Sequence, residues 1–295
     1  MSSMSNEGPT GPPEGSPYFG RLIAVGTKHG KQAQLEPAFR NILGAVLRTP
    51  AGLDTDQFGT FTGETPRTGT AVEAARAKAR LAMRVSGLAC GVASEASYGP
   101  LTGSGVPGHE EILLFCDDLR GIEILEGLRT PSLPGSSQLV EHCDQVPDSL
   151  IAGLPGQALI VRPHDPVPGM ATAAIKGIID TTALRRAVES ATSRSADGLA
   201  AVEPDLRAQH NPSRRLILER LGVTLAYRLA TRCPSCQNPG FGRIATESGL
   251  PCRRCATPTP LLNNEIHGCA SCAHRVARSV TDSLADPADC PKCNP

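Results

Sequence analysis

Cys233-Pro234-Ser235-Cys236 is the first of four Cys-x-x-Cys stretches in the last part of the chain; the others are Cys252-Arg253-Arg254-Cys255, Cys269-Ala270-Ser271-Cys272 and Cys290-Pro291-Lys292-Cys293. Intervals of 15, 13 and 17 residues separate successive stretches, a spacing typical of structural zinc sites. Two stretches supply the four thiolates of one tetrahedral ion and leave no open position for water. The sequence therefore predicts two structural zinc ions, held by eight of the eleven cysteines.

The pairing of the four stretches is open. Sequential pairing joins the first to the second and the third to the fourth, whereas interleaved pairing joins the first to the third and the second to the fourth. Shorter loops lose less entropy on closure, so we expect sequential pairing. The alternative to metal binding is a disulfide or redox cluster. Without a secretory signal the thiols are expected to stay reduced, which favours metal.

The rest of the chain alternates short apolar runs with helical patterns, which predicts an α/β arrangement. Strands are expected at 21–26, 88–93, 111–116 and 157–162, and helices at 34–47, 70–87, 181–193 and 213–230. The expected fold class is an α/β layered domain with a C-terminal zinc-ribbon-like module. The expected organisation is a disordered tail (1–17), the α/β domain (18–200), a connecting helical segment (201–231) and a double zinc-ribbon module (232–295).

The composition excludes some classes of protein. With 29 Lys+Arg against 29 Asp+Glu, the formal net charge is zero, which counts against a generally basic polyanion binder. Aromatic residues make up 3% and Trp is absent, which disfavours a base-stacking platform. The sequence contains no run of 18 apolar residues, so it predicts no membrane-spanning helix. Residues 1–17 lack the apolar core of a signal peptide, so a cytoplasmic location is expected.

Three polar segments follow predicted strands, where ligands bind in α/β sheets. In the first, Thr27, Lys28, His29 and Lys31 are candidate phosphate-binding residues, because cations and backbone N–H groups at a helix start attract phosphate. The second runs from Asp54 to Glu64 and the third from Ser94 to Pro100. Mg²⁺ is bound by one or two carboxylates together with substrate phosphate. Candidate bases or metal ligands are therefore Glu95, Asp54, Asp56 and Glu64.

Each polar segment also has an ordinary structural interpretation. Residues 27–31 can be a solvated turn before a helix, and Asp54 and Asp56 can be turn or capping residues. Glu95 either holds its loop together by hydrogen bonds or acts as the base of a site.

An Arg-rich stretch leads into the cysteine region. From Asp205 to Cys255 there are nine Arg, no Lys and three acidic residues. One interpretation is an anion-binding rim that includes Arg214 and binds phosphate or nucleic acid; the other is a solvated helix face.

Four segments of the chain together resemble an uncharacterised family of bacterial proteins that carry a domain of unknown function. They are Gly26-Thr27-Lys28-His29-Gly30-Lys31, residues 54–64 (DTDQFGTFTGE), residues 93–100 (ASEASYGP) and the cysteine stretches ending Cys293-Asn294-Pro295. This resemblance covers the chain from about residue 21 and implies a family without an assigned activity.

Residues 22–99 are also similar to the front half of the inosine and xanthosine triphosphate pyrophosphatases. That family has a strand, a Thr-x-Asn-x-x-Lys phosphate loop, a Glu-Asn-Ala-x-x-Lys-Ala helix and a strand ending Ala-Asp-Asp-Ser-Gly. The corresponding segments here are 27–31, 73–79 and 93–97. The resemblance implies phosphate binding by Thr27, His29 and Lys31, Mg²⁺ binding by Glu73 and activation of water by Glu95.

These observations support competing hypotheses about function. The first is a Mg²⁺-dependent hydrolase that acts on a nucleotide or another small phosphorylated molecule. The second is a nucleic-acid- or protein-binding protein that uses the Arg-rich segment and the zinc module, with an α/β domain that senses a ligand. The third is a zinc module that only stabilises or dimerises the fold.

Overall fold

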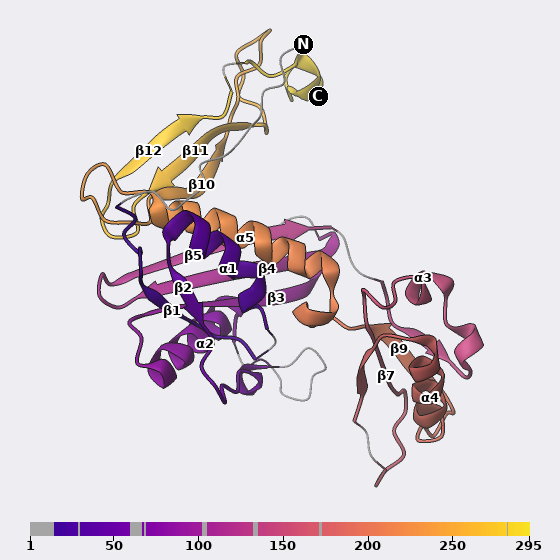
Figure 1. The fold of residues 1–295 in the computed structure, drawn as a ribbon. Coiled ribbons are helices and arrows are strands. Elements are labelled where there is room, and N and C mark those ends of the chain that lie inside the picture. Colours follow the sequence, from indigo (N-terminus) through magenta and orange to yellow (C-terminus); the bar gives the residue numbers. More distant parts are fainter. Residues whose placement is uncertain are drawn as a thin grey trace, which may run out of the picture.

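The computed structural model describes residues 15–28, 30–59, 67, 69–101, 105–131, 135–170, 173–281 and 283–295. Its strands form three sheets of five, four and three strands (Figure 1). The mixture of helices and sheets followed by a cysteine-rich module confirms the predicted fold class.

The five-stranded sheet is the centre of the first unit and has the order β2-β1-β3-β4-β5. Its strands are β1 (Leu22–Val25), β2 (Val46–Arg48), β3 (Cys90–Pro100), β4 (Pro107–Asp117) and β5 (Ile122–Thr130). Strands β2, β1 and β3 are parallel, and β4 and β5 extend the sheet as antiparallel strands. The strands predicted at 21–26, 88–93 and 111–116 are therefore present, whereas β5 was not predicted.

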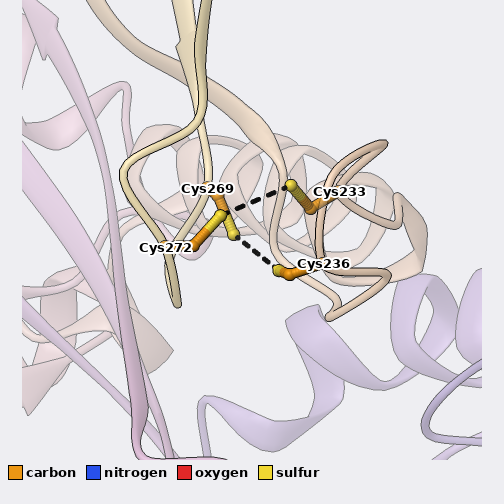
Figure 2. Close-up of side chains that lie close together, drawn as sticks. All are labelled: Cys233, Cys236, Cys269 and Cys272. Carbon is orange, nitrogen blue, oxygen red and sulfur yellow. Dashed lines mark hydrogen bonds between the residues drawn. The ribbon is translucent and has the colours of Figure 1, made fainter.

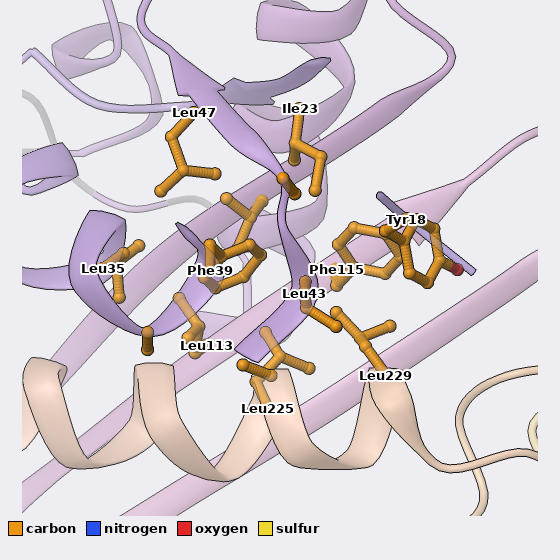
Figure 3. Close-up of a cluster of buried hydrophobic side chains, with 14 of the residues drawn as sticks. Tyr18, Ile23, Leu35, Phe39, Leu43, Leu47, Leu113, Phe115, Leu225 and Leu229 are labelled. Atoms are coloured by element: carbon orange, nitrogen blue, oxygen red, sulfur yellow. The ribbon is translucent and has the colours of Figure 1, made fainter. Parts of the chain in front are cut away.

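Helices cover both faces of this sheet. They are α1 (Gln32–Ala38), which continues as a π-helix (Phe39–Leu43), α2 (Ala71–Ser86) and α5 (Pro212–Ala230). Alternate residues of β4 enter different cores: Leu113 and Phe115 pack with α1 and α5 (Figure 3), while Leu114 and Cys116 pack with α2. Strand β4 therefore contributes side chains to the hydrophobic cores on both faces of the sheet.

The local sequence explains where these helices begin and end. Thr70 and Glu73 form a capping box at the start of α2, and Gly87 ends it in a left-handed conformation (φ +68°). The helix predicted at 34–47 ends earlier, because Gly44 is left-handed (φ 66°) and the chain then enters β2.

The four-stranded sheet, of order β6-β9-β7-β8, has its own core. Its elements are β6 (Gln138–Val140), α3 (Asp148–Ile151), β7 (Leu159–Pro163), β8 (Ile175–Ile178), α4 (Thr181–Thr192) and β9 (Ala200–Pro204). Residues 18–200 therefore contribute to two sheets, and α5, in the expected connecting segment 201–231, returns to pack on the first of them.

The cysteine-rich module contains a three-stranded antiparallel sheet, β10 (Gly242–Ser248), β11 (Leu262–Gly268) and β12 (Arg275–Ser279). It lies beyond the C-terminal end of α5 (Figure 1). Arg228 of α5 fastens it to the first sheet: its Nη1 is 2.7 Å from a carboxylate oxygen of Glu126, and its Nε donates to the Gly240 carbonyl at 3.3 Å.

Candidate functional site

The eight paired cysteines form two compact tetrads that could hold metal ions. One contains Cys233, Cys236, Cys269 and Cys272, and the other Cys252, Cys255, Cys290 and Cys293. In the first tetrad (Figure 2), the Sγ atoms are 3.9 Å apart for Cys233–Cys272 and 3.6 Å apart for Cys236–Cys269. In the second, the sulfur distances are 3.5, 3.6 and 4.0 Å.

The pairing is interleaved, so the prediction of sequential pairing was wrong. One cysteine stretch precedes β10, one lies at each of the two connections, and one follows β12. In an antiparallel meander each strand returns the chain to the opposite end of the sheet. The first and third stretches therefore meet at one end, and the second and fourth meet at the other. Loop entropy does not decide the pairing, because ordered strands and not flexible loops fill the intervals.

Backbone N–H groups donate hydrogen bonds to sulfur atoms of these stretches. The N–H of Arg254 donates to Cys252 Sγ at 3.4 Å, and that of Ser271 donates to Cys269 Sγ at 3.2 Å. The residues after the first two stretches, Gln237 and Ala256, have left-handed φ values of 61° and 57°. Their own N–H groups donate to the carbonyls of Cys233 and Cys252, each at 2.9 Å, and close the two turns.

A cavity of about 400 Å³ lies between the first sheet and the end of the second. Its lining comes from several separate parts of the chain, namely Gly26, Thr27, Lys31, Thr55, Asp56, Gly59, Arg67, Lys78, Glu95, Ala96, Ser97, Tyr98, Lys176, Leu206, Arg207, Ala208 and Arg214.

The cavity forms because neighbouring parallel strands differ in length. Strand β1 ends at Val25, whereas its neighbour β3 continues to Pro100, so the second half of β3 is left uncovered on that side. Helix α2 approaches this end closely: a Cβ on Gly26 would lie 2.5 Å from the Lys78 carbonyl oxygen. Glycine at position 26 therefore allows α2 to bring Lys78 to the cavity.

Lys31 and Lys78, two buried lysines beside β3, have different partners. Lys78 Nζ is 2.5 Å from a carboxylate oxygen of Glu95, and Arg67 lies 3.8 Å from the other oxygen. Lys31 Nζ instead donates to the Ser94 hydroxyl at 2.9 Å and to the Ser94 carbonyl at 3.2 Å. Burial, together with the Arg214 charge, lowers the pKa of Lys31 to about 7.

Arg214 forms the buried back of the cavity. It is 1% exposed and binds Glu111 of β4 in a bidentate manner, with distances of 2.6 and 3.1 Å. Its Nη1 donates to the Leu206 carbonyl at 2.8 Å. Burial alone would raise the pKa of the Glu111 carboxyl. The Arg214 charge and the hydrogen bonds from His109 and Arg214 together outweigh burial and lower the pKa to about 2.

Five of the predicted site residues line this one cavity: Thr27, Lys31, Asp56, Glu95 and Arg214. The other described candidates lie elsewhere. Lys28 is exposed and forms ion pairs with Asp54 (3.2 Å) and Asp56 (2.8 Å), and Asp54 also accepts a turn hydrogen bond from the Asp56 N–H. Glu73 caps α2 through Thr70. His29 and Glu64 lie outside the described residues.

Sequence reasoning missed four of the cations that line the cavity: Arg67, Lys78, Lys176 and Arg207. Arg207 lies in the Arg-rich stretch from which only Arg214 was selected. The signal that could have found Lys78 and Lys176 is the scarcity of lysine, because the chain has only five.

In the part of the chain that the structure describes, acidic side chains do not gather into a further metal site. Within the described ranges, the groups of three or more potential ligands are the two cysteine tetrads. In the same part of the chain, no helix combines the length and apolar character needed to cross a bilayer.

Comparison with known proteins identifies a family without an activity. No curated protein and no solved structure matches the chain. The model of a domain of unknown function, DUF6671, matches residues 78–295. This span covers β3, the cavity residues from Lys78 onward and both cysteine tetrads. The chain therefore belongs to the DUF6671 family, a domain of unknown function.

Proposed function

We propose that the cavity binds a small phosphorylated molecule and that the protein hydrolyses it with Mg²⁺. The charge of the lining carries this proposal. Among the described residues that line the cavity, six are Lys or Arg and two, Asp56 and Glu95, are acidic. A site whose lining has excess positive charge favours an anion, and Arg and Lys are the usual partners of phosphate.

The proposal gives the two acidic residues different tasks. Asp56, at the edge where Lys28 is bound, is the proposed ligand of a Mg²⁺ ion that arrives with the substrate phosphates. Glu95 is the proposed base, which takes a proton from the water that attacks phosphorus. Its contacts with Lys78 and Arg67 fix its orientation. Thr27 and the cavity arginines Arg67 and Arg207 would hold the phosphate oxygens.

We also propose that both cysteine tetrads hold Zn²⁺. A Zn–S bond of about 2.3 Å in a tetrahedral site places the sulfur atoms about 3.8 Å apart. The sulfur distances of 3.5–4.0 Å fit that spacing. Four thiolates leave no position for a substrate, so these ions would stabilise the module rather than react.

Charge does not favour nucleic acid as the partner of the module. Residues 232–295 contain seven Lys or Arg and five acidic residues, a difference of plus two. Each Zn²⁺ with four thiolates carries two negative charges, so the two sites reverse that sign. Nucleic-acid binding needs a cationic surplus, which is why we place the function in the cavity.

Hydrolysis should depend on Glu95. We expect phosphate release from at least one member of a panel of noncanonical nucleoside triphosphates and small phosphate esters with Mg²⁺. Replacement Glu95→Gln should lower the rate by about 10²–10⁴-fold, the usual contribution of a general base. The exposed Glu219→Gln is the matched control and should retain the wild-type rate. Equal background rates for wild type and Glu95→Gln on every substrate would end the hydrolase proposal.

A further inference from the structure

Lysine is scarce in this chain and is concentrated at the cavity. Of 29 cationic residues only five are lysines: Lys28, Lys31, Lys78, Lys176 and Lys292. Three of these five line the cavity, and Lys28 lies on the adjoining loop. Arginine serves as the cation nearly everywhere else. An arginine stays charged in proteins, whereas a buried lysine can lose its proton and react as an amine. The distribution indicates that the cavity uses amine chemistry.

Lys31 is the lysine of the cavity that is placed to be a neutral amine. Its side chain is buried, and its hydrogen-bond partners are two oxygen atoms of Ser94. Lys78, in contrast, has the Glu95 carboxylate as a direct partner, with Nζ 2.5 Å from its oxygen. Within the described part of the chain, no carboxylate lies within ion-pair distance of Lys31 Nζ. A charged Lys31 would therefore be buried without a direct counter-ion.

Charged groups on the neighbouring elements shift the pKa of the Lys31 amine. The cations Arg214 of α5 and Lys78 of α2 oppose its protonation, and the carboxylates Glu111 of β4 and Glu95 of β3 favour it. Both carboxylates are already engaged by arginine or lysine. Burial and the neighbouring cations therefore prevail, and the pKa of Lys31 is about 7. Near neutral pH a large part of the Lys31 population carries a free lone pair.

We propose that Lys31 Nζ forms a reversible imine with the carbonyl carbon of a phosphorylated aldehyde or ketone bound in this cavity. The inference rests on the proposed binding of a phosphorylated molecule but not on its hydrolysis. It narrows the class of ligand to compounds that carry both a phosphate and a carbonyl group. Desolvation beside other cations is a recognised way to activate a lysine for this reaction.

The step requires no oxidant or reductant. The lone pair of the neutral Lys31 amine attacks the carbonyl carbon, and a C–N bond forms as the C=O π bond breaks. A proton moves from nitrogen to oxygen and gives a carbinolamine. The C–O bond then breaks, the hydroxyl group leaves with a proton as water, and the C=N bond forms. Addition of water reverses the sequence.

Pyridoxal 5′-phosphate, which carries both groups, is a suitable probe of the full-length protein. We expect treatment with the probe and then borohydride to add one reduced probe per chain, located on Lys31 by peptide mass spectrometry. Labelling of Lys31 should exceed labelling of Lys28, Lys176 or Lys292 at least about tenfold, because desolvation activates a lysine amine and Lys31 is buried, whereas the other three are exposed or half-buried. Labelling should also fall about tenfold between pH 8 and pH 6 as Lys31 becomes protonated.

Two variants separate the reactive amine from a structural lysine. Lys31→Arg keeps a cation but cannot form an imine, and it should abolish the specific label. Lys292→Arg, at an exposed position in the cysteine module, should leave labelling unchanged. Metal content and circular dichroism of each variant report whether it is folded. If Lys31→Arg does not fold, Ser94→Ala replaces it in the test. Ser94→Ala removes the hydroxyl acceptor of the Lys31 hydrogen bond but keeps the amine, so Lys31 should still be labelled. Label spread evenly over the exposed lysines of the wild type would overturn the inference.

Competition distinguishes failure of this inference from failure of the proposed function. Inorganic phosphate should reduce labelling of Lys31, and pyridoxal without phosphate should label it more weakly. If phosphate binds to the protein but Lys31 is never labelled, the imine is refuted and the phosphate site survives. If Lys31 is labelled equally by both probes and phosphate does not compete, the amine is reactive but the phosphate site is refuted, and the inference falls with it.

Discussion

Replacing Cys233 and Cys269 together by serine should leave one metal ion per chain, whereas replacing Cys233 and Cys252 together should leave none. The first pair belongs to one tetrad and the second pair to different tetrads. Sequential pairing predicts the opposite outcomes, so the two double variants form a crossed test. Metal content per chain, measured by mass spectrometry of the ion, gives the result.

The structural effect of these replacements should be large. A structural zinc site contributes apparent binding energies of about 10–16 kcal/mol at neutral pH in small zinc domains, and the three strands of this module offer few buried apolar residues in exchange. We expect Cys233→Ser/Cys252→Ser to unfold residues 232–295, detected as rapid tryptic cleavage after Arg243 and Arg275. Cys143→Ser, outside both tetrads, is the control and should retain both ions. Interleaved pairing would be contradicted if the Cys233/Cys269 double variant held no metal ion and the Cys233/Cys252 double variant held one.

Arg214→Met should lower the free energy of unfolding by about 3–5 kcal/mol, because it leaves the Glu111 carboxylate buried without its partner. Both groups are almost completely buried, and the pair is bidentate. The neighbouring Arg215→Met is a matched control. The Arg215 side chain makes an exposed hydrogen bond to the Gln209 carbonyl, so its replacement should change stability by less than about 1 kcal/mol. Urea denaturation followed by circular dichroism measures both. Similar losses for the two variants would contradict a buried ion pair at Arg214.

The acid dependence of stability gives a second measure of the same pair. Because the pKa of Glu111 is lowered from 4.5 to about 2 in the folded protein, its contribution is fully present above about pH 4.5 and is lost as the pH falls toward 2. Arg214→Met/Glu111→Leu removes both charges. We expect it to recover most of the stability lost by Arg214→Met and to flatten the stability curve over this pH range.

The sequence was sufficient for elements with strong periodicity and end signals. Thr70, Glu73 and Gly87 mark both ends of α2, and the apolar run at 22–25 marks β1. Strands β10–β12 were not predicted because their residues are largely polar and exposed. Their alternation of direction is nevertheless what decides which cysteines meet, so correct ligands were assigned with the wrong pairing.

The candidate cavity was predictable only in part, because the placement of distant segments, and not a local pattern, decides which residues line it. Thr27 and Lys31 follow β1, as expected, whereas Glu95 lies within β3, which runs beyond the strand expected at 88–93. Their convergence follows from the order of the parallel strands β1 and β3. Arg207 and Lys176 reach the cavity because the second sheet is inserted between β5 and α5. No local pattern encodes that placement. Arg214 was expected on a surface rim, but its bidentate contact with Glu111 draws it into the interior.

The central claim is that this cavity binds phosphate. Isothermal titration calorimetry of the protein with pyrophosphate, at low ionic strength, tests it most directly. We predict one saturable site per chain that weakens with added salt. Arg67→Gln removes one charged contact at the cavity and should weaken binding about 10–150-fold, equivalent to about 1.5–3 kcal/mol. Arg40→Gln, at an exposed position in the π-helix Phe39–Leu43, should bind like wild type. Absence of binding to the wild-type protein, or equal binding by Arg67→Gln and wild type, would contradict the account.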